Sequence, residues 1–152
     1  MITHIGFTGT RDGLTTAQAH KLDYFLQNFG GTYVARHGGC IGADKEFHDL
    51  ALGDEKCYHI IVHPSKDPSL QANYYVRPNR DHVRPPLDYL IRNKNIVYTS
   101  NLMVACPKED KPVIRSGTWA TIRLCRDEGT RLYTIYPNGA MIYEQNTPQI
   151  HT

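Results

Sequence analysis

The sequence predicts an α/β fold: an open parallel sheet of about five strands with helices on both faces and a C-terminal hairpin. Short, apolar segments alternate along the chain with longer segments in which apolar residues recur at helical spacing. This alternation is typical of strand–helix–strand units, which build a parallel sheet covered on both faces. A chain of 152 residues is expected to form one domain, covering residues 1–152.

The first part of the chain predicts three strands and two helices. Residues 3–9 form an apolar run ending in glycine, and residues 32–36 and 58–62 are rich in β-branched or aromatic side chains. A helix capped by Thr15 or Thr16 separates the first two strands, and Gly30-Gly31 is expected to end it. Its apolar positions are Ala19, Leu22, Leu26 and Phe29. A second helix is expected from about Ala43, with Phe47, Leu50 and Ala51 on its apolar face.

Prolines interrupt the pattern over residues 63–86. Proline lacks a backbone donor, so we expect no regular structure here. A connection this long inside a compact domain is usually a functional lid, a binding loop or a mobile segment.

The last part of the chain predicts two further helices, two strands and a hairpin. Pro86 opens a helix that runs to about Val97, followed by a strand at residues 102–106. A charged loop then leads to a helix after residues 116–118, which stops near Gly129. The remaining elements are a strand at residues 132–136, an Asn138-Gly139 turn and a return strand at residues 141–143.

Composition excludes several classes of protein. The 17 Lys and Arg nearly balance the 15 Asp and Glu, giving a formal charge of +2, which disfavours a module for double-stranded nucleic acid. No apolar run is long enough to span a bilayer and the N-terminus does not resemble a signal peptide, so we expect a cytoplasmic protein. The four cysteines are scattered, without metal-ligand spacing, and are expected to be reduced and structural, with no metal site.

Three glycine-containing turns follow predicted strands. They are Gly9-Thr10-Arg11, Gly38-Gly39-Cys40-Ile41-Gly42 and Ser116-Gly117-Thr118. The carboxyl ends of parallel strands share one edge of a sheet, so these turns are expected to converge on one crevice. Glycine lets backbone N–H groups approach an anion, and a helix N-terminus adds partial positive charge, so the turns predict a phosphate cradle. For each turn taken alone, a purely structural role in a cap or tight turn is an equal alternative.

Two familiar nucleotide fingerprints are absent from the sequence. There is no G-x-x-x-x-G-K-[ST], and no G-x-G-x-x-G follows the first strand. We therefore expect neither ATP hydrolysis nor dinucleotide redox chemistry, and no cofactor.

The order of these motifs resembles the SLOG superfamily of Rossmann-like nucleotide-binding proteins. The residues concerned are G-F-T-G-T-R, H-G-G-C-I-G-A-D, R-N-K-N from Arg92, and S-G-T-W-A-T, and the resemblance extends over residues 3–136. That superfamily includes the lonely-guy phosphoribohydrolases, the DNA-processing protein A group and small bacterial and phage proteins. The resemblance implies a nucleotide ligand, and it implies a homodimer or larger assembly, because members often pair through helices beside the cradle.

The lonely-guy motif also indicates where this sequence departs from a hydrolase. That motif reads Pro-Gly-Gly-x-Gly-Thr-x-x-Glu, and its Glu takes part in cleaving the N-glycosidic bond. Aligning its Gly-Thr with Gly117-Thr118 places Thr121 at the Glu position. A hydroxyl cannot replace a carboxylate as a base at neutral pH. Arg92 matches the family's ligand-side arginine, whose planar fork suits phosphate.

Several further side chains are candidates with open alternatives. Asp44 either accepts bonds from ribose hydroxyls, as the resemblance suggests, or complements a helix N-terminus. His37 and His63 each follow a strand and either face the crevice or are structural. Trp119 either stacks on a base or belongs to the core or an interface. Glu46 is expected on a solvated helix face, as is Asp49.

Residues 63–86 also carry aromatic and guanidinium groups in alternation. These are Tyr74, Tyr75, Arg77, Arg80 and Arg84. Such a mixture is able to close over a nucleobase and its phosphates, or to hold a short single strand. The alternative is an exposed connector that its arginines keep soluble.

These observations favour a protein that binds a nucleotide-derived signalling molecule, of the cyclic-nucleotide or ADP-ribose type, and senses or sequesters it without turnover. The short chain favours sequestration, as by a phage-encoded sponge. One alternative is an N-glycoside hydrolase for a nucleoside monophosphate or ADP-ribose-like substrate, using Asp44 or Glu46. A second alternative is a single-stranded DNA-binding module.

Overall fold

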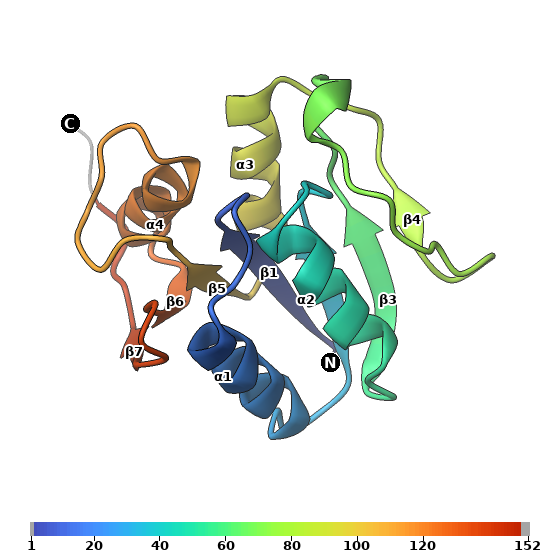
Figure 1. Cartoon of the computed structure of the whole chain (residues 1–152), viewed down its shortest axis with the longest axis horizontal. Helices are drawn as coiled ribbons and strands as arrows, with labels where there is room; N and C mark the ends of the chain where they lie inside the picture. The colour runs from blue at the N-terminus through green and yellow to red at the C-terminus, as the bar shows by residue number, and fades with distance from the viewer. Residues whose placement is uncertain (1, 150–152) are drawn as a thin grey trace.

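Seven strands form one sheet in the order β4-β3-β2-β1-β5-β6-β7 within residues 2–149, which the computed structural model describes (Figure 1). The strands are β1 (Thr3–Gly9), β2 (Tyr33–His37), β3 (Cys57–Val62), β4 (His82–Val83), β5 (Leu102–Cys106), β6 (Arg131–Ile135) and β7 (Met141–Glu144). The helices are α1 (Thr16–Gln27), α2 (Ala43–Leu52), α3 (Tyr89–Thr99) and α4 (Gly117–Glu128), with a short 3-10 turn, η1 (Pro68–Leu70). All neighbouring strands are parallel except β7, which pairs antiparallel with β6.

This architecture confirms the predicted fold class. The five predicted parallel strands are β1, β2, β3, β5 and β6, and the hairpin is β6 with β7. The strand β4 was not predicted, because only two residues, His82 and Val83, pair with the edge of β3.

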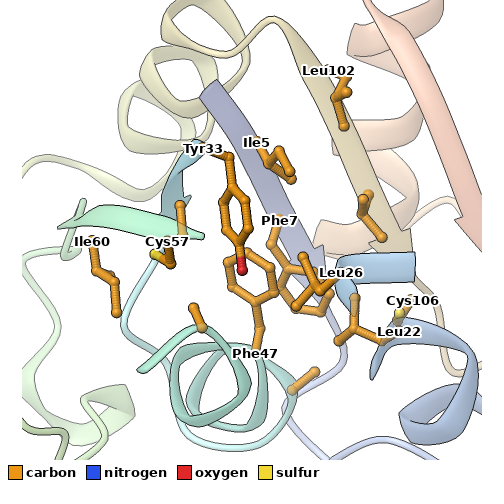
Figure 2. Close-up of a cluster of buried hydrophobic side chains, with 14 of the residues drawn as sticks. Ile5, Phe7, Leu22, Leu26, Tyr33, Phe47, Cys57, Ile60, Leu102 and Cys106 are labelled. Atoms are coloured by element: carbon orange, nitrogen blue, oxygen red, sulfur yellow. The ribbon is translucent and has the colours of Figure 1, made fainter. Parts of the chain in front are cut away.

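The two faces of the sheet carry separate apolar cores. Side chains of β1, β2, β3 and β5 pack against α1 and α2 on one face, and Figure 2 shows this cluster, in which Phe7 and Phe47 meet. Their rings stack at 4.5 Å with an interplanar angle of 6°. On the other face, Met103, Ala105 and Leu132 pack against α3 and α4. Alternate residues of β5 therefore serve opposite faces, as expected for a strand buried on both sides.

The first helix begins as predicted and ends earlier. The Thr15 side chain accepts a bond from the Gln18 backbone N–H, and the Gln18 side chain accepts one from the Thr15 N–H, which completes a capping box. The helix ends at Gln27 rather than at Gly30-Gly31. Lys56 is the physical reason, because its ammonium group donates to the carbonyl groups of Leu26, Gln27 and Phe29.

Residues 63–86 differ from the prediction of a segment without regular structure. They contain η1 and β4, and Asp81 fastens them to the edge of β3. The Asp81 carboxylate accepts a bond from the Ile60 N–H at 2.8 Å and holds Arg77 in an ion pair at 2.8 Å. The third helix starts at Tyr89 rather than at Pro86. Leu87 instead forms a parallel β-bridge with Ser65. In this bridge the Leu87 N–H donates to the Pro64 carbonyl, and the Leu87 carbonyl accepts a bond from the Lys66 N–H.

The topology has a switch point between β1 and β5. From β1 the chain builds outward through β2, β3 and β4, then crosses back through α3 to place β5 on the other side of β1. In open α/β sheets, ligands bind in the crevice at the carboxyl ends of the strands at such a point. Among the described helices, none has the length and apolarity needed to cross a membrane.

Candidate functional site

A cleft of about 480 Å³ lies at the carboxyl ends of β1, β2 and β5. The three predicted turns, 9–11, 38–42 and 116–118, all contribute to its walls, which confirms that they converge. Of the predicted binding residues, the lining includes Gly9, Thr10, Arg11, Gly38, Cys40, Asp44, Arg92, Ser116, Gly117, Thr118 and Thr121.

The first two turns form one rigid wall of the cleft. The Ala43 N–H at the start of α2 donates to the Thr10 carbonyl at 3.0 Å. A Cβ at Gly42 would collide with the backbone of Arg11, and Gly42 has φ of +87°. A Cβ at Gly9 would lie 2.6 Å from the Cβ of Ala43. Gly9 and Gly42 therefore permit close packing between the turns and do not themselves need to meet a ligand.

Asp44 organises the 38–42 turn from inside. It is 7% exposed, and one of its carboxylate oxygens accepts a bond from the Cys40 N–H at 3.2 Å. Burial raises the pKa of Asp44 to about 6, although the nearby Arg92 guanidinium opposes the shift. Asp44 lies in the first turn of α2, and one of its oxygens is engaged by the 38–42 turn. The N–H groups of Ala43 and Cys40 are thus both occupied by protein acceptors.

Arg92 is placed beside the cleft but is not a free phosphate ligand. Its side chain is 3% exposed, and Nη1 donates to the carbonyl groups of Gly38 at 2.8 Å and His63 at 3.1 Å. Its Nε donates to Asn93, and Nη2 lies 3.8 Å from the Cys40 sulfur. Arg92 therefore fastens the ends of β2 and β3 together, and only its Nη2 edge has no oxygen acceptor in the described chain.

The 116–118 turn forms the opposite wall and starts α4. The Ser116 hydroxyl accepts a bond from the Trp119 N–H at 3.2 Å, as a helix cap does. A Cβ at Gly117 would collide with the Tyr89 hydroxyl, so glycine allows α3 to approach the start of α4. The Thr121 hydroxyl donates to the Gly117 carbonyl at 3.0 Å. For the N–H groups of Gly117 and Thr118, the described residues provide no acceptor, which leaves two donors at a helix N-terminus beside the cleft.

Charged side chains of the loop at residues 107–116 complete this wall. Arg115, Lys108 and Glu109 line the cleft, and the Lys108 ammonium group lies 2.6 Å from the Asp12 carboxylate. The Glu109 Oε1 atom is buried and has no partner among the described residues. These groups could not be predicted from the sequence, because the loop has neither periodicity nor a motif. Its only signal was its position directly after a strand.

Other predicted residues lie outside the cleft. Gly39 and Gly42 belong to the back of the 38–42 turn. His63 is 3% exposed, and its Nε2 atom lies 3.0 Å from Nη1 of Arg36, so its ring is used within the fold. Trp119 is 1% exposed and packs in the core that α3 and α4 form on β5, which is the core alternative for this residue and not the stacking one.

The proposed lid residues are also placed elsewhere. Tyr74 packs beside His37 and His48, and Tyr75 is exposed. Arg77 is paired with Asp81, and the Arg84 N–H donates to Val62 at the edge of the sheet. None of the four side chains lines the cleft, because backbone bonds hold residues 70–84 against β3 and the 38–42 turn. Leu70 is the residue of this segment that reaches the cleft.

The described part of the chain has no cluster of three or more His, Cys, Asp or Glu side chains that would hold a metal ion. Its four cysteines are free and buried, as predicted. Burial raises the pKa of the Cys57 thiol to about 11 and that of Cys125 to about 12, so both stay protonated and unreactive at neutral pH.

Comparison with known proteins identifies the fold. No protein-family model matches the sequence, and no curated protein matches it. Among solved structures, the chain is similar to the X-ray structure of TM1055, a Northeast Structural Genomics Consortium target. The TM-score is 0.59 at 11% sequence identity, and the match covers 86% of this chain and 72% of that one. This likeness supports the α/β fold with its mostly parallel sheet.

Proposed function

We propose that the protein binds a nucleotide or nucleotide-derived signalling molecule, of the cyclic-nucleotide or ADP-ribose type, in the cleft at the switch point. The observation that carries the proposal is the open N-terminus of α4. There, the N–H groups of Gly117 and Thr118 lack protein acceptors, beside a cleft that three glycine-containing turns line. This arrangement suits a phosphate group, because N–H donors and the helix dipole both favour an anion.

Charge and size support the same ligand class. Arg11 and Arg115 line the cleft without a carboxylate partner among the described residues, so both are available to an anion. A volume of about 480 Å³ falls in the range of small-molecule sites, roughly 300–1,000 Å³. In this arrangement the phosphate lies at the 116–118 turn, and the rest of the ligand extends along the wall formed by the 9–11 and 38–42 turns.

Sensing or sequestration without turnover is the form of this function that we favour. The Thr121 hydroxyl, at the position of the hydrolase Glu in the SLOG resemblance, is bonded to the Gly117 carbonyl. Asp44 is committed to the 38–42 turn, and Glu46 accepts a bond from the Leu14 N–H at 2.8 Å. The two carboxylates considered for a relocated catalytic role are therefore engaged in holding loops, which supports binding over cleavage.

A second candidate function, N-glycoside hydrolysis, is favoured by one observation. Glu109 lines the cleft with a buried carboxylate oxygen that has no partner among the described residues. An unpartnered carboxylate beside a bound nucleotide has the chemistry of a general base. In this alternative Glu109, rather than Asp44 or Glu46, activates water.

We also propose that the protein acts in the cytoplasm as a homodimer that pairs through α3. The outer side of this helix exposes Leu90, Ile91 and Tyr98, which are 65%, 50% and 57% accessible. Contiguous exposed apolar side chains on one helix are typical of a contact surface. Light scattering of the purified protein and of an Ile91→Glu variant tests this: the variant is expected to be monomeric.

The test of function is calorimetric titration with AMP, cyclic AMP and ADP-ribose, with chromatography of each mixture for released base. We expect binding of at least one nucleotide, no base release, and at least a tenfold loss of affinity in Arg115→Ala. Arg131→Ala is the matched control, because Arg131 lies on β6 and contacts Tyr143. Absence of binding for every nucleotide refutes the proposal. Base release that Glu109→Gln abolishes establishes the second candidate instead.

A further inference from the structure

Two buried histidines form a continuous hydrogen-bonded chain behind the cleft. The Gly39 N–H donates to Nδ1 of His37 at 2.9 Å. Nε2 of His37 lies 2.8 Å from Nδ1 of His48, and Nε2 of His48 lies 2.7 Å from the Tyr75 carbonyl oxygen. Both rings are fully buried. The chain thus runs from the 38–42 turn, through β2 and α2, to the segment that follows η1.

The two ends of this chain fix the protonation state of both rings. The Gly39 N–H is a donor, so Nδ1 of His37 must carry no proton, and a neutral His37 then carries its proton on Nε2. His37 donates that proton to Nδ1 of His48, which must also be unprotonated. His48 consequently carries its proton on Nε2 and donates it to the Tyr75 carbonyl. One arrangement of protons satisfies every bond, with both histidines neutral.

The surroundings favour the neutral state. His37 faces the rings of Phe47 and Tyr74, and its charged or titratable neighbours are Arg92, His63 and His48. Burial, with these neighbours, holds the pKa of His37 well below its ordinary value. For His48, burial likewise lowers the pKa, and it outweighs the opposing Tyr75 carbonyl and Asp49 and Asp81 carboxylates, while Lys45 acts with burial.

The hydrogen-bonded histidine chain links the 38–42 turn to the segment that follows η1. Backbone hydrogen bonds link the same two segments on the cleft side. The Ala72 N–H donates to the Gly39 carbonyl at 2.9 Å, and the Ile41 N–H donates to Leu70 at 3.0 Å. Both Ile41 and Leu70 line the cleft. Gly39 has φ of +68°, a conformation that glycine adopts without steric cost, so hydrogen bonds select it from the other conformations open to glycine. The histidine chain supplies the bond on the buried side.

We propose that His37 and His48 are positioning residues of the cleft: His48 fixes the tautomer of His37, and the unprotonated Nδ1 of His37 holds the Gly39 N–H and thereby fixes the 38–42 turn and Leu70 in the ligand-binding arrangement. The proposal rests on the proposed function, since it concerns the same cleft. Neither histidine touches the ligand, because neither ring lines the cleft. Loss of the Nδ1 acceptor leaves the Gly39 N–H buried without a partner, and that cost falls on the arrangement that binds ligand.

Two substitutions of His37 separate its two bonds. An Asn amide oxygen occupies the place of Nδ1, so His37→Asn keeps an acceptor for Gly39 but does not reach His48. A Gln amide reaches the place of Nε2, so His37→Gln keeps the contact to His48 but leaves Gly39 without an acceptor. His20→Asn, on the exposed side of α1, is the matched control.

The first experiment measures affinity for AMP and ADP-ribose by calorimetry at pH 8. We expect at least a tenfold loss in His37→Gln, less than a threefold loss in His37→Asn, and no change in His20→Asn. Equal affinities for the Gln and Asn variants overturn the positioning role. If the wild-type protein binds no nucleotide, the proposed function fails. The second experiment then still tests the hydrogen-bonded relay, because it needs no ligand.

The second experiment reads the proton positions without ligand. Long-range nitrogen–proton NMR correlations of the imidazole rings in the folded wild-type protein distinguish the two neutral tautomers and the charged form. We expect the Nε2–H tautomer for both His37 and His48 at pH 7. An Nδ1–H tautomer or a charged ring at either residue overturns the relay, whether or not nucleotides bind.

Discussion

The buried histidines and the buried carboxyl group of Asp44 have opposite effects on how the free energy of unfolding changes as pH falls. His37 and His63 have pKa values below the ordinary 6.5, for His63 about 3, because burial disfavours their charged forms. Below pH 6.5 the unfolded chain binds protons at these residues more readily than the folded chain does. The free energy of unfolding therefore falls as pH falls below 6.5. Asp44 has a raised pKa of about 6, against 3.8 unfolded, so its protonation stabilises the fold as pH falls through 6.

The slope of stability against pH follows from the proton count. Near pH 5 the unfolded chain holds about one more proton than the folded chain at His63 and about one fewer at Asp44. Each proton corresponds to about 1.4 kcal/mol per pH unit, so these two contributions nearly cancel between pH 6 and 5. The lowered pKa of His37 then decides the sign, and the free energy of unfolding should fall as pH falls from 6 to 5. The lowered pKa values of His4 and His48 add to this slope. A domain whose total stability is about 5–15 kcal/mol makes such a change measurable.

Two variants change the count in opposite directions. His63→Asn removes one histidine and should flatten the slope by about 1.4 kcal/mol per pH unit, whereas Asp44→Asn should steepen it by the same amount. Urea unfolding at pH 7, 6 and 5, followed through the fluorescence of Trp119, the single tryptophan, gives the three slopes. Gly30→Ala, which changes no titratable group and meets no atom within 4 Å, serves as the control and should leave the slope unchanged. Equal slopes for wild type and both variants would refute the reasoning.

Three further substitutions test the packing that holds the cleft and the core. Gly42→Ala should cost about 2–3 kcal/mol, because φ is +87° and the new Cβ meets the backbone of the preceding turn, whereas Gly30→Ala, with no atom within 4 Å, should be close to neutral. Lys56→Met should cost about 1.5–3 kcal/mol through loss of three charged hydrogen bonds at the end of α1, and Lys45→Met, on an exposed ion pair, less than about 1 kcal/mol. Phe47→Ala should cost about 3–5 kcal/mol by opening a cavity beneath the stacked pair. Urea unfolding at pH 7 measures all three, and a destabilisation as small as that of the controls would contradict the stated packing.

The sequence predicted the elements that depend on local pattern. Short apolar runs predicted β1 and β5, and helical spacing predicted α1, α2 and α4, because burial on one or both faces imposes a period that a single segment displays. It did not predict β4, since two residues pair there only because Asp81, bonded to Ile60, brings the segment to the edge of β3. Such an interaction between residues far apart leaves no periodicity.

The site was predictable in its position and less so in its detail. Three turns at strand ends had to converge once the sheet was parallel, and they do. The role of Arg92 was not predictable, because whether a guanidinium faces a ligand or two carbonyl groups depends on how α3 lies on the sheet. For Trp119 the sequence left a stacking role and a core position open, although Ile122 and Cys125 follow it at helical spacing, a period that favours the core position the structure shows.

The two walls of the cleft differ in a way that bears on how a ligand would be held. On one wall the N–H groups of Gly39, Cys40 and Ala43 are already satisfied, by His37, Asp44 and Thr10, so binding to these groups gains few new hydrogen bonds. On the other wall, α4 begins with donors that no described residue satisfies. Because an unmade hydrogen bond is worth more to a ligand than one already made, affinity should come from the 116–118 turn and selectivity from the shape of the fixed wall. In the proposed function, the motif richest in glycine therefore shapes the cleft, and we expect the shorter Ser-Gly-Thr turn to bind the anion.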